Sequence, residues 1–562
     1  MGIDLVIRGG TVVDGSGAAG YVGDVAVDEG VIVGIGAVED HGRREIDATG
    51  MLVCPGFIDG YAHMDAQIFW DPLATPVSMH GVTTVVMGNC GFTLAPVQPG
   101  TEELAIRSIE RAEDISRGDL EMGVPWGWRT FSEYLDAVDA TPKGLNVAGY
   151  IGHSALRTFV MGERAYHDPA TEDDLARMGQ ELTDALAAGA IGFSTSQISQ
   201  HRTVDDEPVA SYIGGWDEVD YLARVLGRSG AGVLQLATLM AEPENQAHLL
   251  RLARLSGRPV HQGCIYKADQ PEGFRSSLAF LQQAADEGAR IIGQAHVRPL
   301  VNVIGFKVGL PFDRLPQWRE LRRLPLSEQR HVLEDPERRS VLVDEALHGS
   351  YVTSKVIVEV QARLPDYENL RVLESPLGPN PSLADLARTR GTTPVDLMID
   401  LSLAADFEQY FTQPFANQDE DAVETILRHP RTIIAQSDSG AHVSQLMDSS
   451  IPTHFLAHSV RDRQAFSWEE AIHMLTGRPA REWGLGRRGL VGEGCVADLV
   501  VIDPGSIGPK LPRAVSDLPA GGTRLVQEAE GIYATVVGGD ITSAEGKPTE
   551  ARPGRLIRRS RG

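Results

Sequence analysis

Eight short apolar runs recur along the chain, and each ends near a small or polar residue such as glycine, asparagine, serine, histidine or aspartate. They are residues 56–63, 83–90, 144–153, 190–196, 232–238, 258–264, 290–296 and 432–440. Apolar runs of this length with turn residues at their ends are typical of buried strands. The pattern therefore predicts eight strands whose carboxyl ends carry polar side chains.

Segments with helical periodicity separate many of these runs. Apolar residues recur at i, i+3, i+4 and i+7, and each segment ends near glycine. Four such segments are residues 171–189, 216–230, 243–257 and 275–288. Eight strands alternating with helices predict an α/β protein with a (β/α)8 TIM barrel, whose active site lies at the carboxyl ends of the strands.

The two chain ends have a different pattern, with short strand-like segments separated by glycine turns. We expect residues 1–55 and 480–562 to pair into one small β-sandwich. The barrel then occupies residues 56–479. Residues from about 300 to 430 are too many for an ordinary strand connection and contain helical segments, so they predict an inserted lid or subdomain.

The charge and the cysteines narrow the class of partner. Asp and Glu total 77 against 51 Lys and Arg, a formal net charge of -26, which repels nucleic acid phosphates and anionic membranes. No run approaches the roughly 20 apolar residues of a membrane span. The four cysteines are far apart with no CxxC pair, which is typical of a reducing compartment. We expect a cytoplasmic enzyme with a small-molecule substrate. Whether the enzyme forms a homo-oligomer remains open.

Three residues at the expected barrel mouth have side chains that can take part in catalysis. Tyr61 and His63 are two positions apart, so their side chains point the same way from the first strand. Asp438 follows the last apolar run, where a carboxylate can act as a general base, although a turn or cap aspartate is the simpler alternative. The phenol of Tyr61 either donates a hydrogen bond to a developing oxyanion or fills space.

Several segments spread over the chain together indicate a family. They are LVIRGGTVVDGSG, PGFIDGYAHMD, HGVTTVVMGNCGFTLAP, IGFSTS, AQSDSGAHV and LTGRPAREWGLGRRGLVGEGCVADLVVID. Over essentially its full length the chain resembles the amidohydrolase superfamily, and within it the D-aminoacylase or N-acyl-D-amino-acid deacylase branch. The resemblance implies hydrolysis of an N-acyl amide bond by water that a metal, usually zinc, activates, with the last-strand aspartate as base.

The metal pattern of that family is present only in part. Its first-strand His-x-His pair is Tyr61-Ala62-His63 here, and residues 238–240 and 262–264 place no histidine at the ends of strands five and six. The ligands that remain are His63, Cys90 and Asp438. Three such residues can hold zinc with a water as fourth ligand, or they are remnants of a lost site. For Cys90 the alternative is an inert buried thiol.

Other residues near the strand ends are candidates for substrate binding. Arg298 is the preferred partner for the carboxylate that an N-acyl amino acid carries, with Lys267 second. Histidines and one serine complete the set: His153, His296, His442 and Ser194. For each histidine the alternative is a hydrogen-bonded residue of the core or pocket wall. Ser194 lacks a GxSxG elbow, so it is expected to line the pocket rather than act as a nucleophile.

Three hypotheses of function follow. The first is a zinc amidohydrolase that removes an acyl group from a D-amino acid or opens a related amide, with Asp438 as base. The second is a metal-independent biosynthetic enzyme, a cyclase, dehydratase or lyase, that uses Tyr61, His63 and Asp438 on the same scaffold. The third, a binding protein with a degenerate site, fits least well because the mouth keeps many ionisable groups.

Overall fold

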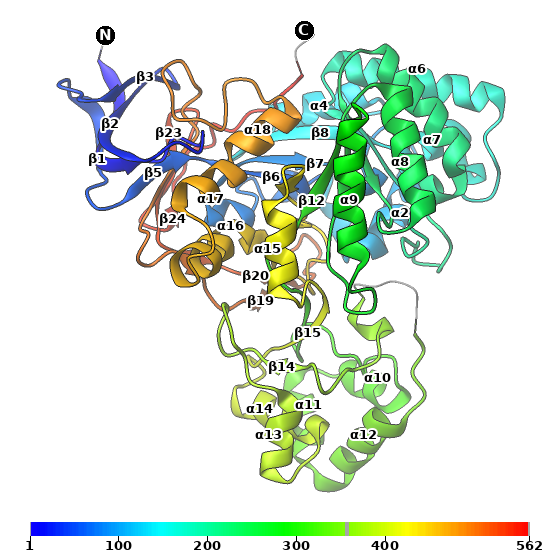
Figure 1. Ribbon diagram of the computed structural model, residues 1–562. Coiled ribbons are helices and arrows are strands. Elements are labelled where there is room, and N and C mark those ends of the chain that lie inside the picture. The colour runs from blue at the N-terminus through cyan, green and yellow to red at the C-terminus, as the bar shows by residue number, and fades with distance from the viewer. Residues whose placement is uncertain (1, 354–358, 560–562) are drawn as a thin grey trace.

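All eight predicted strands form one parallel sheet in the centre of the molecule (Figure 1). The computed structural model describes residues 2–353 and 359–559. The strands are β6 (Phe57–Ala62), β7 (Val82–Met87), β8 (Asn146–Gly152), β9 (Gly192–Ser196), β10 (Val233–Ala237), β11 (Val260–Gly263), β12 (Ile291–Ala295) and β16 (Thr432–Ile434). A parallel bridge between Ala62 and Ser439 joins the first strand to the segment after the last. The predicted (β/α)8 barrel is confirmed.

The first barrel strand shows why the sequence forms this structure. Every residue of β6 is buried, as expected for a parallel sheet covered on both faces. A Cβ atom at Gly60 would lie 2.2 Å from Cη2 of Trp483, so only glycine lets α18 (Gly477–Trp483) pack directly against the strand. Since side chains alternate along a strand, Tyr61 then points to the opposite side, into the barrel.

Helices cover the outside of the barrel (Figure 1). The four predicted helices are α6 (Glu172–Ala188), α7 (Ala210–Arg228), α8 (Pro243–Ser256) and α9 (Gly273–Asp286). In α6, Thr171 and Asp174 form a capping box, and Gly189 ends the helix with a φ of 109°. An N-cap of this kind contributes about 1 kcal/mol, so local sequence specifies where the helix begins and ends.

Shorter helices complete the barrel layer. They are α1 (Gln67–Trp70), α2 (Glu102–Glu113), α3 (Arg117–Gly123), α4 (Phe131–Ala140), α5 (His153–Met161), α15 (Glu420–Arg428), α16 (Ile451–His454) and α17 (Trp468–Leu475). Helix α2 supplies a carboxylate to the pocket, and α5 is joined to α7 by a buried ion pair, as described below.

The two chain ends pair as predicted. Strand β17 (Leu499–Ile502) runs antiparallel to β5 (Leu52–Pro55), and hydrogen bonds join nine strands from both ends into one sheet around a shared apolar core. The other strands of this sheet are β1 (Ile3–Val12), β2 (Tyr21–Asp28), β3 (Val31–Gly36), β4 (Gly42–Asp47), β22 (Ile532–Val537), β23 (Asp540–Ala544) and β24 (Lys547–Pro548). Two short hairpin-like pairs, β18 (Gly508–Pro509) with β21 (Ala529–Glu530) and β19 (Arg513–Val515) with β20 (Arg524–Val526), follow β17.

Most of the long insertion forms a separate lobe below the barrel in Figure 1. It has its own apolar core, between Ile304 and Phe411. Its elements are β13 (Leu300–Ile304), α10 (Pro316–Arg322), α11 (Leu326–Glu334), α12 (Pro336–His348), β14 (Arg371–Val372), α13 (Leu383–Arg390), α14 (Pro394–Ala404) and β15 (Phe411–Ala416). The domain boundaries and the lid function stay predictions. Within the described part of the chain, no helix has both the length and the apolarity to cross a membrane.

Candidate active site

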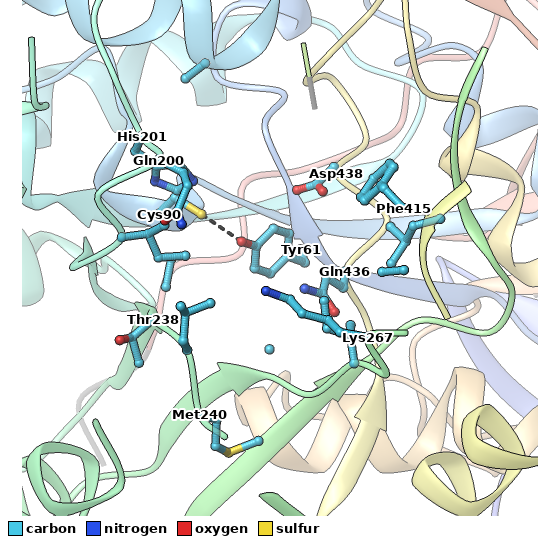
Figure 2. A pocket seen from close by; sticks show the side chains of 18 of the residues that line it. Tyr61, Cys90, Gln200, His201, Thr238, Met240, Lys267, Phe415, Gln436 and Asp438 are labelled. Carbon is cyan, nitrogen blue, oxygen red and sulfur yellow. Dashed lines mark hydrogen bonds between the residues drawn. The ribbon is translucent and has the colours of Figure 1, made fainter. Parts of the chain in front are cut away.

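A cavity of about 230 Å³ opens where the barrel strands end (Figure 2). Tyr61 and His63 from β6, Cys90 after β7, Thr238 after β10 and Asp438 after β16 line it. Much of the remaining wall is apolar and is made by Phe92, Ile198, Leu239, Met240, Ile265, Phe274, Leu300 and Phe415. The cavity thus combines a small polar cluster with an apolar surface, and Leu300 and Phe415 come from the inserted lobe.

The two residues of the first strand do point into the same space. The ring centroids of Tyr61 and His63 are 5.6 Å apart, and the Tyr61 hydroxyl lies 2.7 Å from Cys90 Sγ (Figure 2). His63 lies between two carboxylates: Nδ1 is 3.0 Å from Glu113 Oε1, and Nε2 is 3.5 Å from Asp438 Oδ1. Glu113 was not predicted, because it ends helix α2 and has no strand-end signal in the sequence.

Burial and charge set the protonation of this cluster. Burial alone would lower the pKa of His63, but the charge of Glu113 and hydrogen bonds with Asp438, Cys90 and Glu113 raise it well above its ordinary value. Burial raises the pKa of Tyr61, and the neighbouring Cys90 and Asp438 charges add to the shift. Burial also raises the pKa of Cys90, against a lowering effect of His63. The resting cluster is therefore a phenol, a thiol and an imidazolium held by carboxylates.

Cys90 lies at a sharp turn directly after β7. Its φ is 57°, and Gly88 and Gly91 on either side also have positive φ, a region that side chains other than glycine rarely adopt. Its backbone N–H donates to Gln235 Oε1 at 2.7 Å, and Gly91 N–H donates to Ser194 Oγ at 3.0 Å. Ser194 was predicted to line the cavity, but it does not. Its hydroxyl supports this turn instead, where it also donates to the carbonyl of Gly88.

Asp438 is held beside His63 by contacts between the first and last strand segments. The N–H of His63 donates to the carbonyl of Ser439 at 2.7 Å, and Ser437 Oγ donates to Asp59 Oδ2 at 2.6 Å. A Cβ atom at Gly440 would lie 2.5 Å from the His63 carbonyl oxygen, so the close approach requires glycine. With 20% of its side chain exposed, Asp438 faces the cavity and can exchange a proton with a bound molecule.

The residues present do not fit the metal that the resemblance implies. In residues 2–353 and 359–559, no group of three or more His, Cys, Asp or Glu side chains is arranged to hold a metal ion. At the ends of β10 and β11 the cavity is lined by Ala237, Thr238 and Gly263, none of which has an imidazole. The predicted ligands contact one another and two further groups: His63 lies between Asp438 and Glu113, and the sulfur of Cys90 contacts the phenol of Tyr61.

Two predicted substrate-binding residues after β12 lie outside the cavity, which corrects that prediction. The guanidinium of Arg298 donates to Asp448 Oδ1 at 2.7 Å and to the Met447 carbonyl at 2.9 Å. Nε2 of His296 is 3.4 Å from the same carboxylate. In this buried cluster Asp448 pairs with the guanidinium of Arg298 that was expected to bind a substrate. The sequence did not reveal this partner, because Asp448 lies far along the chain from Arg298.

His153 is also placed away from the cavity. Its ring nitrogens contact Thr195 Oγ1 at 2.8 Å and Glu218 Oε1 at 2.7 Å, and Arg157 pairs with the same glutamate. All of these groups are buried between helices α5 and α7 and strand β9. The predicted substrate-binding role of His153 is corrected to a structural one.

Three other polar residues do reach the cavity. His442 lines it as predicted. Lys267, the second choice for a carboxylate partner, lines it in place of Arg298, and its amino group points toward Tyr61 in Figure 2. His201 was missed, because it lies in the loop after β9 rather than at a strand end; Ser196 Oγ is 2.7 Å from its Nδ1, and burial lowers its pKa to about 4.

A (β/α)8 barrel with an acid–base cluster at the carboxyl ends of its strands has the architecture of a barrel enzyme with its active site at the mouth. The model of the Amidohydrolase family matches residues 44–294 and 348–542. The chain therefore belongs to the amidohydrolase family.

Curated relatives and solved structures similar to this chain include D-aminoacylases and N-acyl-D-amino-acid deacylases. The chain is 28% identical to an N-acyl-D-aspartate deacylase of Alcaligenes xylosoxydans xylosoxydans, over 99% of this chain and 95% of that protein. It is also 28% identical to a D-aminoacylase of the same organism, over 99% and 98% of the two chains. The structure of N-acyl-D-glutamate deacylase from Bordetella bronchiseptica, complexed with zinc and a phosphonate inhibitor, has the same fold, with a TM-score of 0.66 at 24% identity over 100% of both chains.

Proposed function

We propose that this protein hydrolyses the amide bond of an N-acyl amino acid, most simply an N-acyl-D-amino acid. The observation that carries the proposal is that one cavity holds an acid–base cluster, an apolar wall and a lysine amino group (Figure 2). An acyl chain suits the apolar wall, and the amide suits the cluster of Tyr61, His63, Cys90 and Asp438. The names of the curated relatives, N-acyl-D-aspartate deacylase and D-aminoacylase, support this substrate class.

Lys267 is the cation best suited to bind the substrate carboxylate. Arg111 and Arg202, which also line the cavity, both pair with Asp206. No ion pair of Lys267 is found in the described part of the chain, and its amino group faces the cavity. An ammonium that meets a carboxylate in a partly enclosed cavity forms a charge-assisted hydrogen bond.

The proposal is tested by incubating the purified protein with matched D and L N-acyl amino acids and measuring the free amine and the free acid. We expect both products, in equal amounts, from at least one substrate that carries a carboxylate. A product formed without the addition of water would favour the alternative, a metal-independent cyclase, dehydratase or lyase that uses Tyr61, His63 and Asp438. Absence of turnover with binding would favour a binding protein.

The role of Lys267 gives a prediction about KM. Replacing Lys267 with methionine is expected to raise KM for the carboxylated substrate by roughly 10- to 100-fold, because a hydrogen bond between charged groups contributes about 1.5 to 3 kcal/mol. The Lys267→Arg variant should recover part of the affinity, and Lys510→Met, at an exposed lysine paired with Glu528, is the matched control. An unchanged KM in Lys267→Met would contradict the assignment.

Tyr61→Phe removes only the hydroxyl that contacts the thiol. We expect kcat to fall by about 10²-fold, as for the loss of one donor that acts on developing charge, with little change in KM or in the melting temperature. The measurement is steady-state kinetics together with thermal unfolding of both proteins. If kcat stayed within twofold of wild type, Tyr61 would merely fill the space of the missing histidine.

Two further expectations belong to this proposal. Zinc is not part of the proposed site, since the donor set does not fit it, and metal analysis of the purified protein checks this. A location in the cytoplasm is supported by four free cysteines, Cys54, Cys90, Cys264 and Cys495. The oligomeric state stays open and can be measured by sedimentation.

A further inference from the structure

The groups at the predicted metal position contact one another and leave a sulfur atom facing the cavity. Cys90 lines the cavity, its Sγ is 2.7 Å from the Tyr61 hydroxyl, and His63 hydrogen-bonds the same thiol. Burial raises the pKa of this thiol, but the imidazolium of His63 and the phenol of Tyr61 act in the opposite direction, so a thiolate formed at this cavity has partners that stabilise it.

The backbone at Cys90 has the form of a nucleophile turn. In hydrolases that use a serine elbow, a sharp, strained turn after a strand exposes the nucleophile at the end of the sheet. Here Cys90 lies in the short turn Asn89–Gly91 that follows β7, has a φ of 57°, and is flanked by Gly88 and Gly91. The turn is rigid because Gln235 and Ser194 accept its N–H groups. The thiol is therefore presented at a defined position at the barrel mouth.

His63, which contacts Cys90, also lies beside two carboxylates. Asp438 serves as the base, and Glu113 orients the imidazole ring. Glu113 Oε1 lies 3.0 Å from Nδ1 of His63, an ion-pair distance, and Nε2 is 3.5 Å from Asp438, which faces the cavity. Nucleophile, imidazole and orienting carboxylate in contact are the arrangement of covalent hydrolases on unrelated folds.

A polar group without a partner also faces the cavity. Thr238 is buried, and in the described part of the chain its Oγ1 has no hydrogen-bond partner. A hydroxyl in this position can donate to the carbonyl oxygen of a bound amide as negative charge develops on it. It occupies the strand end at which the resemblance expects a metal-binding histidine.

From these contacts we propose that Cys90 is the nucleophile of a metal-independent, two-step amide hydrolysis; this inference rests on the proposed function. In the first step Sγ attacks the acyl carbon while the imidazolium of His63 gives its Nε2 proton to Asp438 and takes the thiol proton in its place, and Asp438 gives the proton that it received to the nitrogen as the C–N bond breaks. The amine leaves, and the acyl group remains on Cys90 as a thioester. In the second step water attacks the thioester, Asp438 takes a water proton and returns it to sulfur, and the free acid leaves.

The test is detection of the acyl-enzyme. The full-length protein, treated with EDTA, is mixed with p-nitrophenyl acetate or with an N-acyl amino acid that it hydrolyses, quenched in acid, and analysed by intact and peptide mass spectrometry. We expect one acetyl or acyl group per chain on the peptide that contains Cys90, and a burst of one equivalent of p-nitrophenol. EDTA is expected to leave kcat unchanged.

Variants give the controls. Cys90→Ala should lose the adduct and lower kcat by about 10³-fold or more, as loss of a catalytic nucleophile does. Cys90→Ser keeps the size of the side chain and serves as a second variant if the first does not fold. Cys495→Ala, at a cysteine that packs against the core of the chain-end sheet, should form the adduct and keep wild-type kcat.

The outcomes separate this inference from the proposed function. Turnover of N-acyl amino acids in Cys90→Ala at more than a tenth of the wild-type rate overturns the nucleophile and leaves the function standing. Stoichiometric acylation of Cys90 by p-nitrophenyl acetate without turnover of any N-acyl amino acid supports the nucleophile and rejects the substrate class. Loss of activity in EDTA that zinc restores, with no adduct, overturns the inference in favour of a metal.

Discussion

Replacing Asp438 with asparagine is expected to lower kcat/KM for an N-acyl amino acid by about 10²- to 10⁴-fold, the range that general acid–base groups contribute. Asp438 is the carboxylate that both faces the cavity and lies beside Nε2 of His63, at 3.5 Å. The substitution keeps the shape of the side chain, and asparagine tolerates the φ of 49° at this position. The loss should therefore appear in catalysis and leave the fold intact.

The measurement is steady-state kinetics of the variant beside thermal unfolding. Asp421→Asn is the matched control, because the side chain of Asp421 on helix α15 is 96% exposed and its ion pair with Arg463 is long, at 4.0 Å. We expect this control to keep wild-type kinetics. Should Asp438→Asn retain more than a tenth of the wild-type kcat/KM while its melting temperature is unchanged, proton transfer by Asp438 would be ruled out.

Replacing Glu218 with alanine is expected to lower the free energy of unfolding by about 3 to 5 kcal/mol, the range for removing one partner of a buried ion pair. Glu218 on α7 accepts hydrogen bonds from Arg157 and contacts Nε2 of His153 at 2.7 Å, both on α5. Without it, the hydrogen bonds that the buried guanidinium of Arg157 keeps within the described residues go to carbonyl groups, at Ala165 and Asp168. The variant should unfold at lower denaturant concentration.

Asp184→Ala is the matched control for this loss. Asp184 is exposed on helix α6, where its side chain accepts a hydrogen bond from Gln180, so its replacement should change stability by no more than about 0.5 kcal/mol. Equal denaturation midpoints of Glu218→Ala and wild type would show that the pair does not hold α5 to α7.

The same glutamate predicts a dependence on pH. Burial raises the pKa of Glu218, but His153 and Arg157 outweigh it and hold the pKa below its ordinary value. A carboxyl group whose pKa is lowered by folding stabilises the fold above its unfolded pKa, and this contribution is lost as the pH falls through the folded pKa. The stability difference between wild type and Glu218→Gln should therefore shrink in acid and be largest near neutral pH.

The barrel itself could be predicted from the sequence because its signals are local. Apolar runs with polar ends and helices with caps, such as Thr171 and Gly189 around α6, depend on neighbouring residues only. The same holds for the shared direction of Tyr61 and His63, which follows from the period of a strand. The partial loss of the metal pattern was also visible, since it concerns residue types at known strand ends.

Other parts of the site could not be predicted in this way. Arg298 and Lys267 are both cations near strand ends, and nothing local shows that Asp448 neutralises the first and leaves the second to face the cavity. Glu113 ends a helix and still becomes the partner of His63. Ser194 is at a strand end, and its hydroxyl supports a turn in the neighbouring strand's loop.

By itself, the sequence determined the barrel, the pairing of the chain ends, the family, and the side chains that the first strand presents at the mouth. Only the tertiary structure decided which ionisable groups are paired in the interior, which reach the cavity, and that Tyr61, His63 and Cys90 contact one another where a metal was expected. The physical reason is the range of the interactions. Strand and helix patterns come from backbone geometry between close neighbours, whereas burial and charge pairing depend on residues that only folding brings together.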